Sequence, residues 1–292
     1  MKKSELLTHC WHCFVLYLGL NALTNNPVAA QQLVLNNAYT YGGSLDDYFT
    51  RVLAAGPSRL TLLGFTRSSN TNFGTLNGNY DGWIINVDTS GNRIWSKFLG
   101  GPGDDRILGA TYHNGLLYAV GYSSSVGGVI QSNAGSTDGW VICVNSEGDM
   151  VWQKNLGGTS NDQINNIVVD ATGHLIITGF TNSNNGVFTN NYGGQDLWVA
   201  KLTINGDLIW SYCYGGSQND VGTGIAIDPS GNINVIGYTN SNNHNINVGL
   251  GGTDIWLLKL SPSGIFLSEE TYGGTGNDLG RGIKWASDGT LL

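Results

Sequence analysis

The stretch at residues 214–220, YGGSQND, returns at residues 272–278 as YGGTGND, and the unit of 58 residues between the two starts decides the fold. Related Gly-Gly pairs recur in steps of 58, 57, 58 and 58 residues, beginning at Gly42, Gly100, Gly157, Gly215 and Gly273. A fixed period of this length indicates stacked supersecondary units, none of which can bury its apolar face alone. Most of the chain is therefore predicted to be a tandem array of one unit.

Each unit carries four strand signals separated by turns. In the fourth unit a first strand is predicted at residues 222–227, and it ends at the turn Asp-Pro-Ser-Gly of residues 228–231, where the glycine supplies a positive φ. A second strand follows at residues 233–238, a third begins at Asp254 just ahead of Trp256, and a fourth completes the unit. The other units repeat this order, with third-strand aspartates at Asp81, Asp138 and Asp196. No useful helical period appears in the repeats, so the fold is predicted to be all-β, with four-stranded antiparallel sheets.

Four-stranded units of this length in tandem favour a β-propeller, in which sheets arranged radially as blades bury one another's faces. A β-solenoid is the alternative, but its coils are usually shorter and lack four turn-separated strands. The repeat domain is predicted to span residues 31–292, with complete blades at 41–98, 99–155, 156–213 and 214–271.

Both ends of the array are predicted to be partial. Residues 33–39 stand where a fourth strand belongs, immediately before the first Gly-Gly pair. Residues 272–292 hold a first strand and the start of a second. The ring is therefore expected to be incomplete, an open arc whose bare edges favour self-association.

Two runs carry a family resemblance: YGGSQNDVGTGIAIDPSGNINVIGYTNS at residues 214–241 and LGGTSNDQINNIVVDATGHLIITGFTNS at residues 156–183. They resemble SBBP (seven-bladed beta-propeller) repeats of bacterial secreted and surface proteins, and the resemblance covers residues 41–292. It implies a propeller fold, further blades, commonly seven in all, and a C-terminal sorting domain outside this sequence, which would make the chain a fragment. Kelch repeats also combine a Gly-Gly pair with a tryptophan, but there the pair ends the second strand.

The first thirty residues predict a secretory signal peptide. Lys2 and Lys3 precede the apolar run at residues 14–20, and small residues end at Ala30, the expected cleavage position. The apolar run is too short to cross a bilayer and no later stretch reaches the roughly 20 residues needed, so a membrane-spanning protein is not expected. The mature chain is predicted to be secreted or held at the cell surface.

Charge argues against a nucleic-acid-binding protein, and cysteine content argues against a disulfide-stabilised scaffold. Removing Lys2, Lys3 and Glu5 from totals of 13 basic and 21 acidic residues leaves 11 and 20, a formal charge of −9. Phosphate binding needs a basic footprint, so a nucleic-acid partner is not expected. Cys143 and Cys213 alone follow the signal peptide, too few for a disulfide scaffold. They are interpreted as apolar positions, with a single bridge between them as the alternative.

An aspartate recurs after every Gly-Gly pair and suggests two alternatives. Asp oxygens in glycine-rich loops suit calcium, but an aspartate repeated equally in all units is typical of a turn cap that accepts backbone N–H groups. We favour the cap and predict no metal or other cofactor, with calcium as the alternative. The candidates are Asp47, Asp105, Asp162, Asp220 and Asp278.

The repeated tryptophans suggest either carbohydrate stacking, quinone docking as in quinone-dependent dehydrogenase propellers, or packing between blades. Their presence at one register in each unit favours packing. After residue 30 the sequence contains no nucleophile elbow, zinc-protease helix motif, phosphate loop or C-x-x-C pair. The chain is therefore predicted not to be an enzyme.

Long loops between the second and third strands, and between blades, are expected on one face of the disc. Amide, hydroxyl and aromatic side chains gather in these loops, Phe73 and Phe188 among them, and suit a glycan or a surface protein. The predicted function is an exported, non-enzymatic binding or adhesion module; a polysaccharide lyase or hydrolase, a quinone-dependent dehydrogenase and a structural spacer are the alternatives. The candidate ligand contacts are Asn184, Asn185, Tyr192, Asn242, Asn243 and His244.

Overall fold

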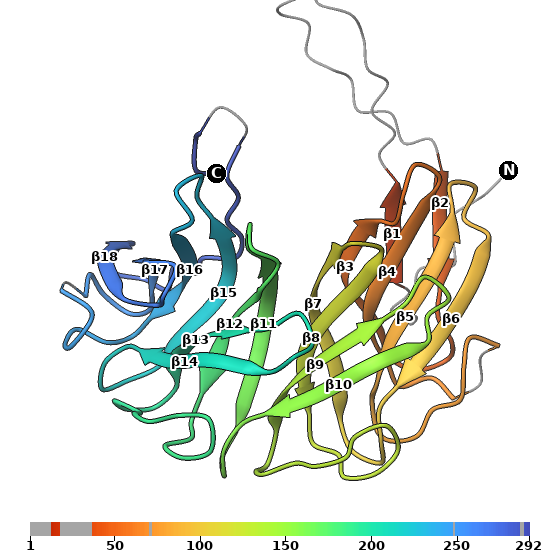
Figure 1. Cartoon of the computed structure of the whole chain (residues 1–292), viewed down its shortest axis with the longest axis horizontal. Helices are drawn as coiled ribbons and strands as arrows, with labels where there is room; N and C mark the ends of the chain where they lie inside the picture. Colours follow the sequence, from red (N-terminus) through yellow and green to blue (C-terminus); the bar gives the residue numbers. More distant parts are fainter. Residues whose placement is uncertain (1–12, 18–36, 70–71, 248, 287–288) are drawn as a thin grey trace, which may run out of the picture.

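The computed structural model describes residues 13–17, 37–69, 72–247, 249–286 and 289–292. These residues form β-strands, turns and loops and no helix, so none of them provides a helix able to cross a membrane. Sixteen of the strands make four separate four-stranded antiparallel sheets, which confirms the predicted all-β blades. Figure 1 shows the sheets following one another around an arc that does not close into a ring.

The blades have matching strand order and nearly equal strand lengths. The first consists of β3 (Asp47–Ala54), β4 (Arg59–Thr66), β5 (Asp81–Asp88) and β6 (Arg93–Leu99). The second consists of β7 (Asp105–His113), β8 (Leu116–Ser123), β9 (Asp138–Val144) and β10 (Met150–Leu156). The third consists of β11 (Asp162–Val169), β12 (Leu175–Thr181), β13 (Asp196–Leu202) and β14 (Leu208–Tyr214). The fourth consists of β15 (Asp220–Ile227), β16 (Ile233–Thr239), β17 (Asp254–Leu260) and β18 (Phe266–Tyr272).

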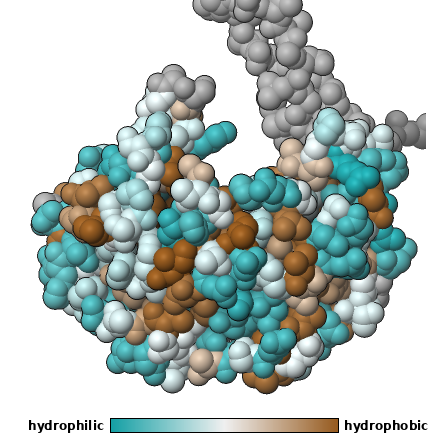
Figure 2. Space-filling model, viewed as in Figure 1, coloured by the Kyte–Doolittle hydropathy of each residue, from teal (hydrophilic) through white to brown (hydrophobic). Residues whose placement is uncertain are grey.

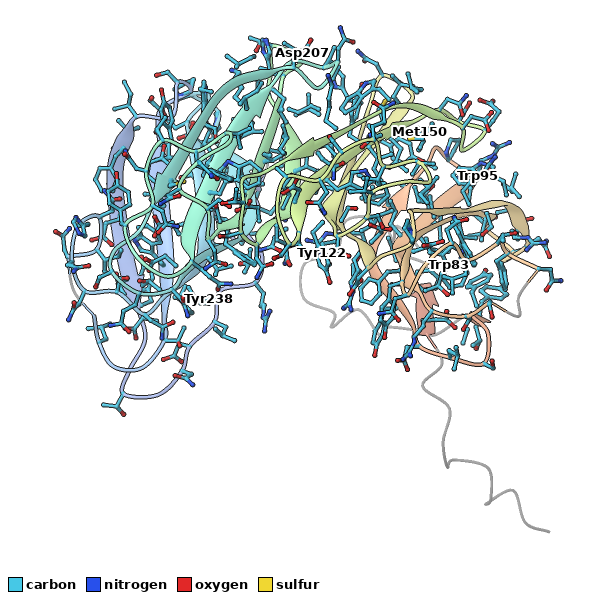
Figure 3. All side chains as sticks on the ribbon, turned by 90° about the horizontal axis from the view of Figure 1, so that it is seen from below. Trp83, Trp95, Tyr122, Met150, Asp207 and Tyr238 are labelled. Atoms are coloured by element: carbon cyan, nitrogen blue, oxygen red, sulfur yellow. The ribbon has the colours of Figure 1, made fainter. Side chains whose placement is uncertain are left out.

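The third strand of each blade lies in the core. All seven residues of β9 are buried, and Trp83, Trp140, Trp198 and Trp256 have no exposed surface. Each indole N–H donates to a side chain of the neighbouring fourth strand, as Trp198 does to Ser211 Oγ at 2.9 Å. The predicted packing role of these tryptophans is therefore confirmed, and Figure 3 shows Trp83 within the first blade.

First strands of successive blades contact each other along the inner side of the arc. Every first strand has a register shift at the same point, which leaves one residue outside the ladder. At three blades this residue reaches the next repeat: Thr50 Oγ1 donates to the Ile107 carbonyl at 2.9 Å, and Thr223 Oγ1 to that of Gly280 at 2.7 Å. Asn165 does the same with Gly222, at 2.7 Å. The second blade has Leu108 here, whose side chain cannot donate.

The two ends of the array differ from the blades. β1 (Cys13–Tyr17) pairs with β2 (Asn37–Tyr41), so part of the predicted signal peptide contacts the repeat domain, while residues 1–12 and 18–36 lie outside the description. Of the predicted fourth strand at residues 33–39, residues 37–39 belong to β2, and residues 33–36 lie outside the described residues. The expected first strand of the fifth unit is not formed: beyond Tyr272 the described residues make only isolated bridges, one of which joins Trp285 to Leu291 near the end of the chain.

Candidate functional site

The outer strand of each of the first three blades contacts the hairpin turn between the third and fourth strands of the next blade. Trp95 on β6 (Figure 3) donates its indole N–H to the Ser146 carbonyl at 2.8 Å. Two residues later, Lys97 Nζ lies 3.0 Å from Asp149 Oδ1. Lys154 and Asp207 form the same pair at the next junction, with a separation of 3.5 Å.

The junction between the third and fourth blades departs from this rule. Tyr212 occupies the lysine position and Ile265 the aspartate position. Tyr212 stacks on Trp210, with ring centroids 5.3 Å apart and an interplanar angle of 20°, and it lies against Gly264 of the turn. An ion pair found at two junctions is thus replaced at the third by an aromatic and an aliphatic side chain.

A groove of about 280 Å³ lies at this altered junction. No acidic or basic side chain lines it. Tyr212, Phe266 and Tyr192 are 44%, 39% and 37% exposed, so their rings are open to a ligand. The lining residues are Thr189, Asn190, Tyr192, Tyr212, Cys213, Tyr214, Asn245, Gly264, Ile265 and Phe266.

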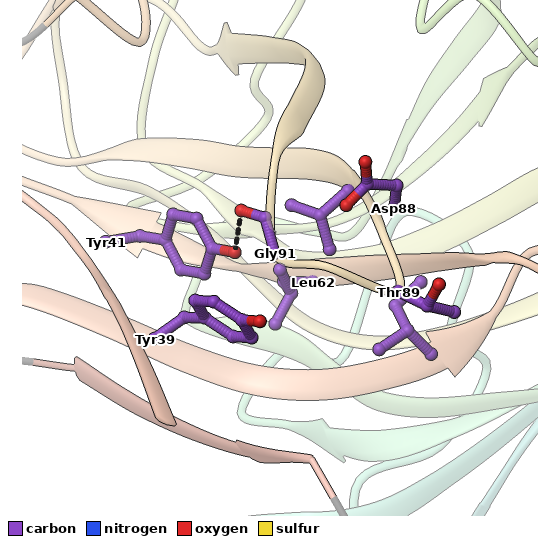
Figure 4. Close-up of a pocket in the computed structure, with 8 residues that line it drawn as sticks. Tyr39, Tyr41, Leu62, Asp88, Thr89 and Gly91 are labelled. Atoms are coloured by element: carbon purple, nitrogen blue, oxygen red, sulfur yellow. Dashed lines mark hydrogen bonds between the residues drawn. The ribbon is translucent and has the colours of Figure 1, made fainter. Parts of the chain in front are cut away.

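The junction of β2 with the first blade provides a closed counterpart of the groove. Tyr41 donates its hydroxyl to the Gly91 carbonyl at 2.7 Å (Figure 4), and Tyr214 makes the matching bond to Gly264. The cavity beside Tyr41 has a volume of only about 10 Å³. The shared tyrosine bond holds both junctions, so the open space at the third and fourth blades comes from the side chains around it.

Two of the predicted ligand contacts meet beside the groove. The rings of Tyr192 and His244, from the long loops of neighbouring blades, have centroids 5.3 Å apart. His244 has a φ of 57°, a left-handed conformation uncommon for a residue other than glycine. Asn184 and Asn242 are exposed in the same two loops. The structure thus joins Tyr192 and His244 at the groove's edge.

Asn185 and Asn243 are used within the fold. Asn185 Oδ1 accepts the backbone N–H of Thr159 at 2.9 Å, and Asn243 Oδ1 accepts that of Ser217 at the same distance. Each side chain therefore fixes its loop to the Gly-Gly turn of its own blade. Phe188, a loop aromatic in the sequence, is buried against Trp198 with ring centroids 5.0 Å apart.

The repeated first-strand aspartates act as turn caps. Asp105 accepts the Gly101 N–H and the Ser125 hydroxyl, each at 2.7 Å, and also the Ser123 hydroxyl. The same N–H bond recurs for Asp47, Asp162, Asp220 and Asp278. Among the described residues, no group of three or more His, Cys, Asp or Glu side chains is placed to hold a metal ion.

Cys213 and Tyr214 are the titratable groups in the floor of the groove. Burial raises the pKa of the Cys213 thiol, and the Asp196 carboxylate raises it further. Burial likewise raises the pKa of Tyr214. Both groups are therefore protonated near neutral pH. Cys143 is also a free thiol, so the two cysteines are not bridged in this structure.

A second irregular cluster lies between the first and second blades, and sequence reasoning missed it. Arg106 forms two bonds with Asp104, of 2.8 and 2.9 Å, and lies over the rings of Phe65 and Tyr80 at 4.6 and 4.3 Å from their centroids. Because the guanidinium is both paired and stacked, we assign it a role in fixing the two blades together.

Comparison with known proteins identifies the repeat. Residues 209–244 match the family model of the SBBP beta-propeller repeat. This segment, from the fourth strand of the third blade into the fourth blade, is an SBBP-type repeat. No curated protein matches the chain. This match and the strand pattern confirm the predicted family resemblance.

Solved structures similar to the SBBP-type array are distant in sequence. The Pan2 WD40 domain of Neurospora crassa has a TM-score of 0.51 and 11% identity, over 87% of this chain and 60% of that one. A Bacteroides caccae protein of unknown function has a TM-score of 0.31 and 10% identity, over 84% of this chain and 89% of that one. A luciferin-regenerating enzyme has a TM-score of 0.41 and 11% identity, over 86% of this chain and 70% of that one. The likeness to the Pan2 domain, of whose length the SBBP-type chain spans 60%, supports a propeller fold and no particular activity.

The groove itself could have been found from the repeat. Aligning the units places Tyr212 among Lys97 and Lys154, and Ile265 among Asp149 and Asp207. Such a break in an otherwise regular array is a visible signal. Sequence reasoning examined the long loops instead and found only the Tyr192 side of the groove.

Proposed function

We propose that this protein is an exported, non-enzymatic β-propeller module that binds neutral glycans in the groove between its third and fourth blades. The observation that carries the proposal is the exchange of a Lys–Asp pair for Tyr212 and Ile265 at one junction. The exchange places exposed aromatic surface where the other two junctions carry an ion pair.

The chemistry of the lining favours a carbohydrate. Sugar rings present apolar C–H faces that pack on aromatic rings, and Tyr192, Tyr212 and Phe266 offer such rings. Hydroxyl groups need donors and acceptors, which Asn190 and Asn245 provide. No charged side chain lines the groove, and the chain as a whole is acidic, so a neutral sugar fits better than a uronic acid or a sulfated sugar.

Binding is favoured over catalysis by the state of the groove's titratable groups. Hydrolysis or elimination needs a general acid and base poised near the working pH, whereas the pKa values of Cys213 and Tyr214 are raised well away from it. His244 is exposed at the edge of the groove beside Tyr192, and no carboxylate lines the groove to act with it as an acid–base pair. A spacer role gives no reason for the one open junction.

A glycan array tests the proposal with a variant that uses the protein's own design. In Tyr212→Lys with Ile265→Asp, the altered junction receives the ion pair of the other two junctions, so folding is expected to persist. The wild type should bind neutral oligosaccharides, and the double variant should lose at least about tenfold in affinity, or about 1.4 kcal/mol. Absence of binding to every neutral glycan, or equal binding by the variant, would refute the proposal; binding of an extracellular protein alone would replace it.

A further inference from the structure

Two buried aspartates meet at each blade junction, across the first glycine of the Gly-Gly pair. Asp81 begins the third strand of the first blade, and Asp105 begins the first strand of the second. A methyl group placed on Gly100 would lie 2.8 Å from Asp81 Oδ1 and 2.7 Å from Asp105 Oδ2, so the glycine allows the two carboxyl groups to approach. The arrangement recurs as Asp138 with Asp162 around Gly157, and as Asp196 with Asp220 around Gly215.

The two members of a pair have different partners. The first-strand aspartate accepts donors on both oxygens, as Asp105 does from Gly101, Ser123 and Ser125. The third-strand aspartate accepts its hydrogen bonds on Oδ2. Asp81 Oδ2 accepts the Asn77 backbone N–H at 2.8 Å and the Asn77 side-chain amide at 3.2 Å, and Asp138 Oδ2 accepts the Ala134 N–H at 2.7 Å. The Oδ1 of the third-strand aspartate is buried without a hydrogen-bond partner, and this holds in all four blades: Asp81, Asp138, Asp196 and Asp254.

Two ionised carboxylates at such a position are unfavourable for two reasons. Burial penalises each charge, and the like charges repel. A buried acceptor without a donor adds a further cost. One proton on the unpartnered oxygen removes one of the two buried charges and the repulsion between them, and it gives the pair a donor.

We propose that each of these three blade junctions holds one proton, carried by the third-strand aspartate and donated from its Oδ1 to the first-strand carboxylate. The assignment within the pair follows from the donors already present, because they stabilise the ionised form of the first-strand carboxylate on both oxygens, whereas the third-strand Oδ1 has none. At the fourth junction Asp254 and Asp278 have the same placement around Gly273, but Asp278 is partly exposed.

The surroundings of the pairs support this assignment. Burial, and then the charge of Asp105, raise the pKa of Asp81 to about 6 against the opposing Asn77 N–H. Burial raises the pKa of Asp196 to about 7, with Asp220 adding to it. Burial raises the pKa of Asp220 as well, but there the bonds from Thr239, Gly216 and Ser241 oppose the shift. Burial also raises the pKa of Asp138, with Asp162 adding to it.

The charged and titratable groups near the pairs provide no counterion. Beside Asp196 and Asp162 lies the Cys213 thiol of β14. Arg106 follows Asp105 in sequence but pairs with Asp104, and no cation contributes to the pKa of Asp81, Asp138 or Asp196. The proton is thus the available positive charge.

The sign of the pH effect follows from the raised pKa values. The folded chain holds these protons at pH values where the unfolded chain, with aspartate near pH 3.9, has lost them. Stability is therefore greatest near the unfolded pKa and falls as pH rises through about 6 to 7. The melting temperature of the full chain should drop by about 5 °C or more between about pH 5 and about pH 8.

Asparagine substitution separates the two members of a pair. In Asp81→Asn/Asp196→Asn, each Oδ1 can accept the backbone N–H and each Nδ2 can donate to the first-strand carboxylate, which copies the protonated acid. This variant should melt like the wild type near pH 3, below the unfolded pKa, and about 3 °C or more above it near pH 8. In the matched variant Asp105→Asn/Asp220→Asn the amide hydrogens would face donors that are already present. Its melting temperature should therefore be lower than that of the wild type at both pH values.

Three results would overturn the proposal. The first is a third-strand variant destabilised at both pH values. The second is carboxyl ¹³C resonances of the wild type that show no buried aspartate titrating above about pH 5, a measurement that needs no variant. The third is stabilisation by millimolar calcium near pH 8 that is lost in the third-strand variant, which would make the pair a cation site.

Discussion

Lys97 Nζ lies 3.0 Å from Asp149 Oδ1 and so connects the outer strand of the first blade to the hairpin turn of the second. Both side chains are substantially exposed, at 40% and 64%. Exposed pairs contribute little because water and salt screen them. We predict that Lys97→Ala lowers the free energy of unfolding by less than about 1 kcal/mol, with a smaller effect in high salt. Urea denaturation at two salt concentrations checks this, and a large, salt-independent loss would be inconsistent with it.

The first glycine of the Gly-Gly pair is predicted to be far less replaceable than the second glycine of the last pair. A methyl on Gly157 would lie 2.9 Å from Asp162 Oδ2 and closer still to Asp138 Oδ1. Nothing lies within 4 Å of the same methyl on Gly274. Gly157→Ala should cost roughly 2 kcal/mol or more, and the control Gly274→Ala less than about 0.5 kcal/mol. Equal melting temperatures for the two variants would contradict this contact.

The buried third-strand tryptophan is predicted to carry more stability than the outer one. Trp198 is fully buried and its indole N–H donates to Ser211, so Trp198→Ala should cost about 3 to 5 kcal/mol. Trp210 is only partly buried on the outer strand, and its replacement by alanine should cost less than half as much. Chemical denaturation of both variants measures the difference; a larger loss for Trp210 would place the core elsewhere.

A second pH effect is predicted on the acid side. Lys201 lies 2.7 Å from Asp170, and although burial opposes ionisation, the bonds from Lys201, Thr172 and His174 hold the Asp170 pKa well below its usual value. A lowered folded pKa stabilises the chain above the unfolded pKa, and this stability is lost as pH falls below about 4.

Asp170→Asn tests that acid limb directly. The variant should flatten the loss of stability between about pH 4 and about pH 2, and should leave unchanged the loss between about pH 5 and about pH 8. Thermal melts across both ranges separate the two effects. An unchanged acid limb would show that Asp170 does not contribute to it.

Structural features that repeat along the chain could be predicted from the sequence, and features that occur once were predicted only in part. The third strands begin at Asp81, Asp138, Asp196 and Asp254 as predicted, because four copies of one pattern reinforce the assignment. The fifth unit was predicted to start a strand and does not, since a strand needs a neighbour and sequence pattern alone does not provide one.

The site was predicted only in part, because it depends on contacts between segments that are distant in the sequence. Tyr192 and His244 come from different blades, and their contact depends on the angle between two sheets. Asn185 looked like a ligand contact because loop amides are common to both binding and turn geometry, and only the bond to Thr159 distinguishes them. Figure 2 shows polar and apolar side chains intermixed on the face seen in Figure 1.

Calorimetric titration tests the central claim most directly. The neutral oligosaccharide with the strongest array signal would be titrated into the wild type, into Tyr212→Lys/Ile265→Asp, and into Asn184→Ala/Asn242→Ala as a control on the exposed long loops. The groove account predicts a dissociation constant at least about tenfold weaker for the first variant and unchanged for the second. Wild-type affinity in the Tyr212→Lys/Ile265→Asp variant, with binding lost instead in the loop variant, would contradict it.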